Sequence, residues 1–403
     1  MRNLAAFLPA VLIGLGTAVS LGFSRFDYAL ILPSMMDRLG WNYSEAGGLN
    51  TANAIGYLAG AIGTGRVIGR FPVRDLFLGG LVLTSLSVLV SGLVASYPLL
   101  LLLRLAAGIF AALSFICGGV LVSGLFPQDP RRSGAAISLY TGGGGFGILL
   151  SGLFLPVLFA KYGPGFWPRA WMMLGAAGFL FAGLSSLASL ASYPPETVPV
   201  HGGNAAPWAP RSFLPALSGY FLFGAGYLVY MTYFVKWVEN AGFGPAMIAF
   251  VWGTLGLSVI LSPLFWRRML SRHPGGRSMG LSIGMASLGA VIPLLSRSLP
   301  VMLLSALVFG FAFLNVPAAV TAMIRSSLPR TSWGPSITFF TVLFALGQIA
   351  GPALGGTISD RSGSLSSGLA VSFLALAAGA FVSLFQKTPL PEEIRDCQPS
   401  SKE

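Results

Sequence analysis

Long apolar runs separated by short polar gaps extend along this chain of 403 residues. Runs of about 20 residues are long enough for a helix to cross the roughly 30 Å of bilayer hydrocarbon. They are too long and too rich in leucine and glycine for barrel strands, which alternate in polarity over about ten residues. The pattern therefore predicts an all-helical membrane protein with twelve spans: 6–36, 46–65, 76–96, 98–124, 134–160, 170–192, 212–235, 245–266, 278–296, 299–324, 335–359 and 365–386.

The composition agrees with this prediction, since only 9% of the residues are charged and 54% are hydrophobic. A soluble globular domain has about 25% charged residues. The first apolar run is too long for the apolar region of a secretion signal, so it is predicted to be a membrane span.

The distribution of arginine and lysine predicts the orientation. Sixteen of the 24 lie in segments that share a side with the N-terminus, six lie on the other side, and Arg25 and Arg104 lie within spans. Because cytoplasmic loops carry the excess of positive charge, both termini are predicted to lie in the cytoplasm of a bacterial-type inner membrane. The net charge of +12 then follows from topology, and no nucleic-acid partner is expected.

The second half of the chain repeats landmarks of the first at an offset of about 202 residues. The matches lie at segment ends: Gly40 with Gly242, Pro98 with Pro300, Pro127 with Pro329, and Arg66 and Arg70 with Arg268 and Arg272. This predicts two six-helix bundles, over 1–192 and 212–386, joined by a cytoplasmic linker at 193–211 and followed by a cytoplasmic tail at 387–403. Such parallel repeats are typical of transporters that bind a solute between their halves.

Three motifs support this prediction. Residues 104–108 read R-x-x-x-G, residues 347–355 read G-x-x-x-G-P-x-x-G, and residues 360–363 read D-R-x-G. Together they resemble motifs of the major facilitator superfamily, over the whole length of the chain. In that family the arginine of the first motif is often tied to proton coupling, and the second motif packs helices.

Two segments qualify the resemblance. The loop at 65–70 is a degenerate G-x-x-x-D-R-x-G-R-R motif that lacks the acidic residue, which puts the gating role of that residue in doubt here. Residues 25–28 read R-F-x-Y and are followed by Leu32-Pro33, which resembles a poorly characterised bacterial branch. This second resemblance identifies no solute.

Arg25, Asp27 and Arg104 are charged residues inside apolar spans. A charge at the bilayer centre costs roughly 2.5 to 3.5 kcal/mol, so such residues usually line a path for a solute or a proton. The second half of the chain lacks these charges, which predicts an asymmetric functional site between two similar halves. In the second half the equivalent positions are uncharged: Tyr227, Val229 and Ala306.

We predict that Asp27 carries a coupled proton. Burial favours its neutral form and a nearby arginine favours the carboxylate, so movement of Arg104 could load and unload the proton. The alternative is a static salt bridge from Asp27 to Arg104 or Arg25 that orders helix packing. Arg25 and Asp27 are two residues apart and should face different sides, unless Gly22 lets the helix unwind.

Two arginines against one acid predict a positive midplane that binds an anion, because a guanidinium offers a two-point fit to a carboxylate. The alternative is that one arginine is neutralised structurally or extends toward the interface. Polar and aromatic residues of the spans are predicted to complete the site, although such residues also serve in packing. The predicted solute-binding residues are Arg25, Arg104, Tyr28, Asn53, Tyr57, Tyr140, Tyr227, Tyr230, Phe313, Asn315 and Gln348.

The predicted function is proton-coupled secondary transport of a small, monocarboxylate-like organic anion by alternating access, in a protein expected to be a monomer. Proton-coupled efflux of drugs or metabolites is the alternative within transport. A non-transporting receptor or scaffold on the same fold is the alternative of another class, although the loops are short for a signalling domain.

Enzyme function and cofactors are not expected. The sequence has no pattern of histidines, paired acids or nucleophiles that would form a catalytic or metal site. The glycine run at 142–147 lacks the Lys-Ser/Thr ending of a phosphate loop and lies in a membrane span, where glycines allow close helix packing.

Overall fold

The computed structural model describes residues 6–191, 209–273 and 275–387, and every regular element in these ranges is helical. The predicted linker and tail lie mostly outside the described residues. The first half, here called the N-half, contains α2 (Leu8–Thr17), η1 (Ala18–Phe26), α3 (Tyr28–Leu39), α4 (Tyr43–Val67), α5 (Val73–Ser91), α6 (Tyr97–Ser123), α7 (Pro130–Tyr162), η2 (Pro164–Phe166) and α8 (Trp167–Ala191). The second half, here called the C-half, contains η3 (Pro210–Phe213), α9 (Leu214–Asn240), α10 (Pro245–Arg272), α11 (Gly276–Leu295), α12 (Leu299–Phe313), α13 (Asn315–Ser327), α14 (Arg330–Ser362) and α15 (Leu365–Leu384).

Eleven of the described helical stretches are long and apolar enough to cross a membrane. The other predicted span corresponds to α4, which is 25 residues long and therefore about 37 Å from end to end. Its carboxamides Asn50 and Asn53 make it more polar, and both are buried in protein. The prediction of an all-helical membrane protein is confirmed.

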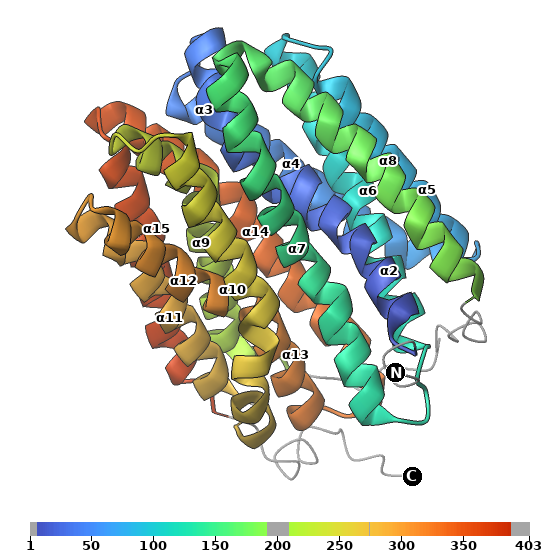
Figure 1. Cartoon of the computed structure of the whole chain (residues 1–403). Helices are drawn as coiled ribbons and strands as arrows, with labels where there is room; N and C mark the ends of the chain where they lie inside the picture. Colours follow the sequence, from blue (N-terminus) through green and yellow to red (C-terminus); the bar gives the residue numbers. More distant parts are fainter. Residues whose placement is uncertain (1–5, 192–208, 274, 388–403) are drawn as a thin grey trace, which may run out of the picture.

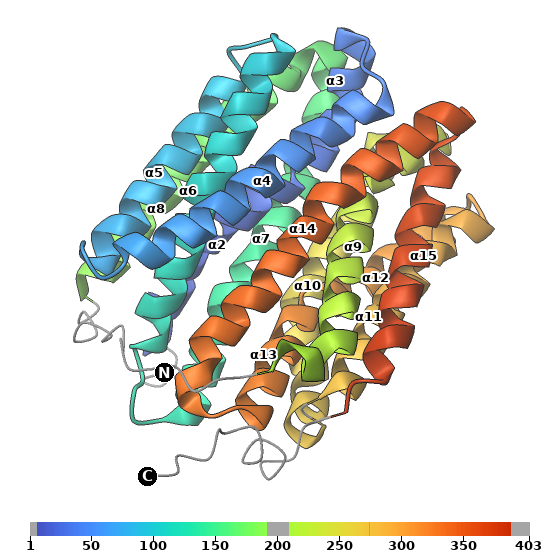
Figure 2. The same ribbon diagram turned by 180° about the vertical axis from the view of Figure 1, so that it is seen from behind.

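The two halves lie side by side, with α7 against α10 and α4 against α14 where they meet (Figures 1 and 2). Glycines let these helices approach closely. A Cβ atom on Gly47 of α4 would lie 2.4 Å from the carbonyl oxygen of Pro352. A Cβ atom on Gly256 of α10 would lie 2.6 Å from the backbone nitrogen of Leu149. The halves therefore pack backbone against backbone.

We expect Gly256→Ala to lower the thermal stability of the purified protein, because the added methyl group forces α10 away from α7. Such overpacking typically costs about 1–3 kcal/mol. Gly253→Ala is the matched control, since a Cβ atom there meets only leucine side-chain atoms at 3.6 and 3.9 Å. Equal melting temperatures for the two variants would contradict the tight crossing.

The first span is not the regular helix that the sequence predicted over 6–36. Residues Ala18–Phe26 form a π-helix between α2 and α3, and the amide of Asp27 donates to the carbonyl of Gly22 at 3.0 Å. A Cβ atom on Gly22 would lie 2.9 Å from the Cα of Gly147, so glycine allows this segment to pack on α7. π-helical turns are rare and often occur at functional sites.

The span predicted over 299–324 is also interrupted. Helix α12 ends at Phe313 and α13 begins at Asn315, because Pro317 has no amide hydrogen with which to continue the helix. Near the break, the carbonyl of Phe311 accepts hydrogen bonds from the Oγ of Ser262 (2.8 Å) and the Nε1 of Trp266 (2.6 Å), both on α10.

Glycines with positive φ follow equivalent helices of the two halves. Gly40 follows α3 with φ 69° and Gly242 follows α9 with φ 88°, and these positions are 202 residues apart. Gly163 follows α7 with φ 73° and Gly363 follows α14 with φ 64°. Glycine adopts such angles without steric cost. The turns thus carry the repeat that the sequence predicted.

Candidate functional site

The two interrupted spans meet between the halves. Phe26, at the end of the π-helix, contacts Phe313 edge-on with ring centroids 5.7 Å apart. Nearby, the Nη2 of Arg25 donates across the boundary to the Oε1 of Gln348 at 2.7 Å. The Nε2 of Gln348 donates to the hydroxyl of Tyr227 at 2.7 Å, and the Tyr227 ring stacks on Phe313. Four predicted site residues are therefore connected, and a fifth, Tyr57, joins them.

The guanidinium of Arg25 has no acidic partner among the residues that the structure describes. It lies over the ring of Tyr57, 5.1 Å from the centroid, in a cation–π contact. Arg25 is only 4% exposed, and its Nε has no hydrogen-bond partner within the described part of the chain. The ion pairs among the described residues involve Arg132 and Lys236 instead. A buried cation balanced by an amide oxygen and a ring favours an anion beside it.

Arg104 of α6 is held largely within the N-half. Its Nη1 donates to the carbonyl of Ser24 at 2.5 Å, and its Nη2 donates to the Oδ1 of Asn50 at 3.2 Å. The guanidinium lies 5.0 Å from the ring centroid of Tyr28 and 5.3 Å from that of Trp171. Arg104 therefore anchors the π-helix to α4 and α6.

Asp27 is completely buried, and neither of its carboxyl oxygens has a hydrogen-bond partner among the described residues. The polar groups that act on it are the hydroxyl of Ser151 on α7 and the indole of Trp252 on α10, and neither reaches hydrogen-bonding geometry. In the described part of the chain, Asp27 forms no ion pair with Arg25 or Arg104. The static salt bridge considered above is therefore absent from this conformation.

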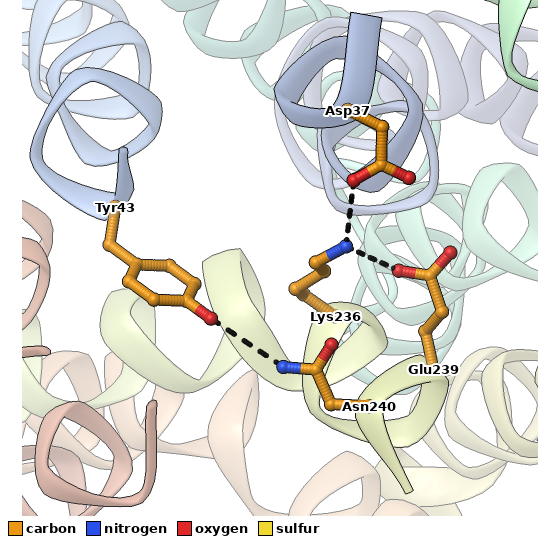
Figure 3. Close-up of polar contacts among 5 residues, drawn as sticks. All are labelled: Asp37, Tyr43, Lys236, Glu239 and Asn240. Atoms are coloured by element: carbon orange, nitrogen blue, oxygen red, sulfur yellow. Dashed lines mark hydrogen bonds and ion pairs between the residues drawn. The ribbon is translucent and has the colours of Figure 1, made fainter. Parts of the chain in front are cut away.

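Polar side chains close the bundle at the end where α3 gives way to α4 (Figure 3). The Nζ of Lys236 on α9 lies 3.1 Å from the Oδ1 of Asp37 in the N-half and 2.8 Å from the Oε2 of Glu239. The Nδ2 of Asn240 donates to the hydroxyl of Tyr43 at 3.5 Å. These contacts join α3 and α4 to α9. We call this the closed end.

The carboxylate of Asp360 on α14 strengthens the closed end by binding the N-terminus of α4. Its Oδ1 accepts from the amide of Tyr43 at 2.9 Å, and its Oδ2 accepts from the amide of Ser44 at 2.8 Å and from the Ser44 hydroxyl. The first amides of a helix lack partners within the helix and carry partial positive charge. A carboxylate of the C-half thus supplies the hydrogen-bond acceptors that the first amides of an N-half helix need.

We expect Asp360→Asn to favour opening of the closed end, because the neutral amide loses the charge and at least one of the accepted hydrogen bonds. Each 1 kcal/mol lost should raise the open population about fivefold. The measurement is the labelling rate of a cysteine at Thr51, on the α4–α14 boundary, in an otherwise cysteine-free background.

Asp129→Asn is the matched control for this prediction. Asp129 also caps a helix, accepting from the amides of Arg131 and Arg132, but all three residues belong to the N-half. Equal labelling rates in both variants and the unmodified protein would show that Asp360 does not hold the halves together.

The other predicted solute contacts form hydrogen bonds within their own halves, so packing accounts for their position here. In the N-half, Tyr28 donates to the carbonyl of Ala46 (2.8 Å), Asn53 to that of Arg104 (3.2 Å) and Tyr140 to that of Phe115 (2.6 Å). In the C-half, Asn315 donates to the hydroxyl of Ser282 (2.8 Å), and the hydroxyls of Tyr230 and Ser305 share a hydrogen bond (2.7 Å).

Sequence reasoning did not single out Asn50, Thr232 or Trp252. The Nδ2 of Asn50 donates to the Oγ1 of Thr232 at 2.7 Å, which extends the hydrogen bonds of Arg104 to α9. Asn50 could have been found in the same way as Asn53, as a carboxamide in a membrane span that needs a partner. Thr232 gave no such signal, because a threonine hydroxyl can bond to its own helix, as this one does to the carbonyl of Leu228.

Two halves of membrane-spanning helices, closed at one end and with buried charges between them, define a membrane transporter of the major facilitator type. The chain belongs to the family described as "Uncharacterised MFS-type transporter YbfB", whose model matches residues 17–384. This range includes both halves. The resemblance inferred from the motifs is therefore confirmed, and a small-molecule solute and a membrane are the partners that the family implies.

Curated relatives match part of the chain. The multi-drug resistance efflux pump PmrA of Streptococcus pneumoniae is 30% identical over 195 residues, which cover 46% of this chain and 45% of that protein. The uncharacterised MFS-type transporter YuxJ of Bacillus subtilis is 29% identical over 149 residues, 36% of this chain and 38% of that protein. The chain thus spans less than half the length of the curated relatives it matches.

Solved structures match nearly the whole chain. A crystal structure of a mutant of the nucleoside transporter NupG has a TM-score of 0.72 at 10% identity, covering 94% of this chain and 98% of that one. A bacterial homologue of the human lysosomal transporter Spinster, in an inward-facing and unoccupied conformation, has a TM-score of 0.65 at 16% identity, covering 94% and 95%. At these identities the similarity concerns the fold.

Proposed function

We propose that this protein is a proton-coupled secondary transporter that moves a small organic anion by alternating access, with symport of a monocarboxylate-like solute as its specific form. The buried guanidinium of Arg25 is the observation that carries this proposal. It donates a hydrogen bond across the boundary between the halves and, in the described ranges, has no acidic partner. A carboxylate would supply both the missing charge and two hydrogen-bond acceptors.

Asp27 is the proposed proton carrier. An unpaired carboxylate in a dry interior is costly, so we assign the neutral acid to this conformation. Asp27 lies toward α7 and α10, whereas Arg25 contacts α4 and α14. The proton and the solute would then bind on different sides of the first span, and separation of α7 from α10 would admit the water that accepts the proton.

Arg104 is proposed to contribute to coupling through position rather than through a direct ion pair with Asp27. It holds the carbonyl of Ser24, three residues before Asp27, and its partner Asn50 is bonded to Thr232 of the C-half. A movement of α9 relative to α4 would therefore be transmitted to the π-helix that directly precedes the proton site.

The charge distribution supports an orientation for this cycle. With both termini in the cytoplasm of a bacterial-type inner membrane, the closed end faces outward, and the conformation described here is sealed against the outside. The six-helix halves would be the two moving units. A monomer suffices, because one chain supplies every residue of the proposed site.

Solute-dependent proton movement in proteoliposomes tests the proposal. Adding an organic monocarboxylate to protein-containing vesicles should make the external medium more alkaline, with no such change in protein-free vesicles. Uptake of the anion without proton movement would reject the coupling. Proton movement elicited by organic cations but not by anions would reject the solute class.

Proton-coupled efflux of amphipathic compounds is the second candidate, and the similarity to the efflux pump of Streptococcus pneumoniae favours it. Under this candidate, an imposed proton gradient should drive the compound and the protons in opposite directions. The same vesicles distinguish the candidates, because symport moves the solute and the protons in the same direction.

A further inference from the structure

We propose that the solute site selects planar aromatic carboxylates, with the carboxylate on Arg25 and the ring against a wall of stacked side chains. This inference rests on the proposed function and narrows its solute class from organic anions in general. It depends on two features of the boundary between the halves, namely the free edge of the guanidinium and the parallel orientation of the neighbouring rings.

The edge of the Arg25 guanidinium formed by Nε and Nη2 is only half occupied. Nη2 donates to the Oε1 of Gln348, whereas Nε has no partner although it is buried. A carboxylate that replaced Gln348 would accept from both nitrogens in the two-point arrangement that guanidinium and carboxylate prefer. The guanidinium also lies over the ring of Tyr57, which leaves its edge directed away from that ring.

Five rings of the C-half form the wall. Each of its stacked pairs lies within 17° of parallel, with centroids between 4.6 and 6.1 Å apart. The members are Tyr220, Phe223, Tyr227, Phe313 and Phe344. Tyr227 connects this wall to the charge, since its hydroxyl accepts from the Nε2 of Gln348. A flat ring attached to the carboxylate would continue the stack.

Exposure indicates where such a ring would enter. Tyr227 and Phe313 are buried, but Phe344 of the C-half and Tyr57 of the N-half are partly exposed. Each half therefore contributes one ring with accessible surface near the site. A solute that inserts between them takes the place of Gln348 on Arg25, which removes the hydrogen bond from the π-helix to α14. Binding would in this way release one contact between the halves.

Matched ligands test the selectivity on the purified full chain by calorimetry. The probes are benzoate, cyclohexanecarboxylate, acetate and benzylamine, which separate the effects of ring planarity, ring bulk and charge. We expect benzoate to bind about two- to tenfold more tightly than cyclohexanecarboxylate, because one aromatic stacking contact is worth about that factor. Acetate should bind more weakly than either, and benzylamine should not bind.

Phe344→Leu should remove the preference for benzoate while leaving the affinity for cyclohexanecarboxylate nearly unchanged. Phe77→Leu is the control, because it makes the same replacement at a ring away from the site. Phe77 belongs to α5, is fully buried and packs against Gly16 and Gly118 of the N-half. If Phe344→Leu does not fold, the ligand series on the unmodified protein still decides the question.

The outcomes separate this inference from the proposed function. Equal affinities for benzoate and cyclohexanecarboxylate, or a benzoate preference that survives Phe344→Leu, would overturn the aromatic site while leaving anion transport standing. Binding of benzylamine in place of the carboxylates would overturn both. A benzoate preference that is lost in Phe344→Leu and retained in Phe77→Leu would support the inference.

Discussion

Replacing Asp27 by asparagine is expected to abolish gradient-driven accumulation of the solute while partly preserving binding and exchange. The amide keeps the shape of the neutral acid in a site that is completely buried, but it cannot release a proton. The internal solute concentration should then rise only to the external value. The measurement is uptake of labelled solute into proteoliposomes with an imposed pH gradient, compared with exchange at equal pH.

Asp75→Asn is the control for this prediction, because Asp75 is an exposed acid in the first turn of α5. It should accumulate solute like the unmodified protein. Full proton-coupled accumulation by Asp27→Asn would end the assignment of Asp27 as the proton carrier. A loss of both accumulation and exchange would indicate instead that the carboxyl group is needed for folding or opening.

Replacing Arg25 by lysine is expected to weaken binding of a carboxylate by about tenfold or more without loss of expression. Lysine keeps the positive charge but cannot offer the Nε and Nη2 pair, and a hydrogen bond to a charged group contributes about 1.5–3 kcal/mol. The measurement is the dissociation constant by calorimetry. An aromatic and an aliphatic carboxylate should both be affected, which distinguishes this variant from Phe344→Leu.

Arg104→Lys provides the matched comparison. Because Arg104 donates to the carbonyl of Ser24 and makes cation–π contacts with the rings of Tyr28 and Trp171, its replacement should lower the melting temperature more than the affinity. If both lysine variants bind the solute normally, or if the solute proves to be a cation, the anion site is wrong and the two arginines are structural.

Much of the fold could be predicted because the bilayer constrains it locally. Every backbone group in hydrocarbon must be satisfied within its own segment, so span positions follow from apolar runs alone. The predicted run 46–65 corresponds to α4 although that helix is the most ambiguous in hydropathy. Gly40 and Gly242, matched by the repeat, both adopt the left-handed conformation that ends a helix.

Helix irregularity was less predictable. A π-helix needs no particular residue, and the one at Ala18–Phe26 depends on packing against α7 through Gly22. The break after Phe313 had a local cause in Pro317, but proline also occurs inside α10 and α14 without dividing either helix. Whether a proline interrupts a span therefore depends on the packing around it, which the local sequence does not show.

The sequence by itself determined the membrane class, the spans, the repeat, and the rare charges Arg25, Asp27 and Arg104. Only the tertiary structure decided which groups the charged residues contact. Arg25 donates to Gln348, which is 323 residues away, and Asp360 accepts from the N-terminus of α4. The physical reason is that the free-energy cost of burying a charge depends on residue type and depth in the membrane, and both can be estimated from the sequence. The choice of partner depends on helix rotation and crossing, which arise only when both halves pack together.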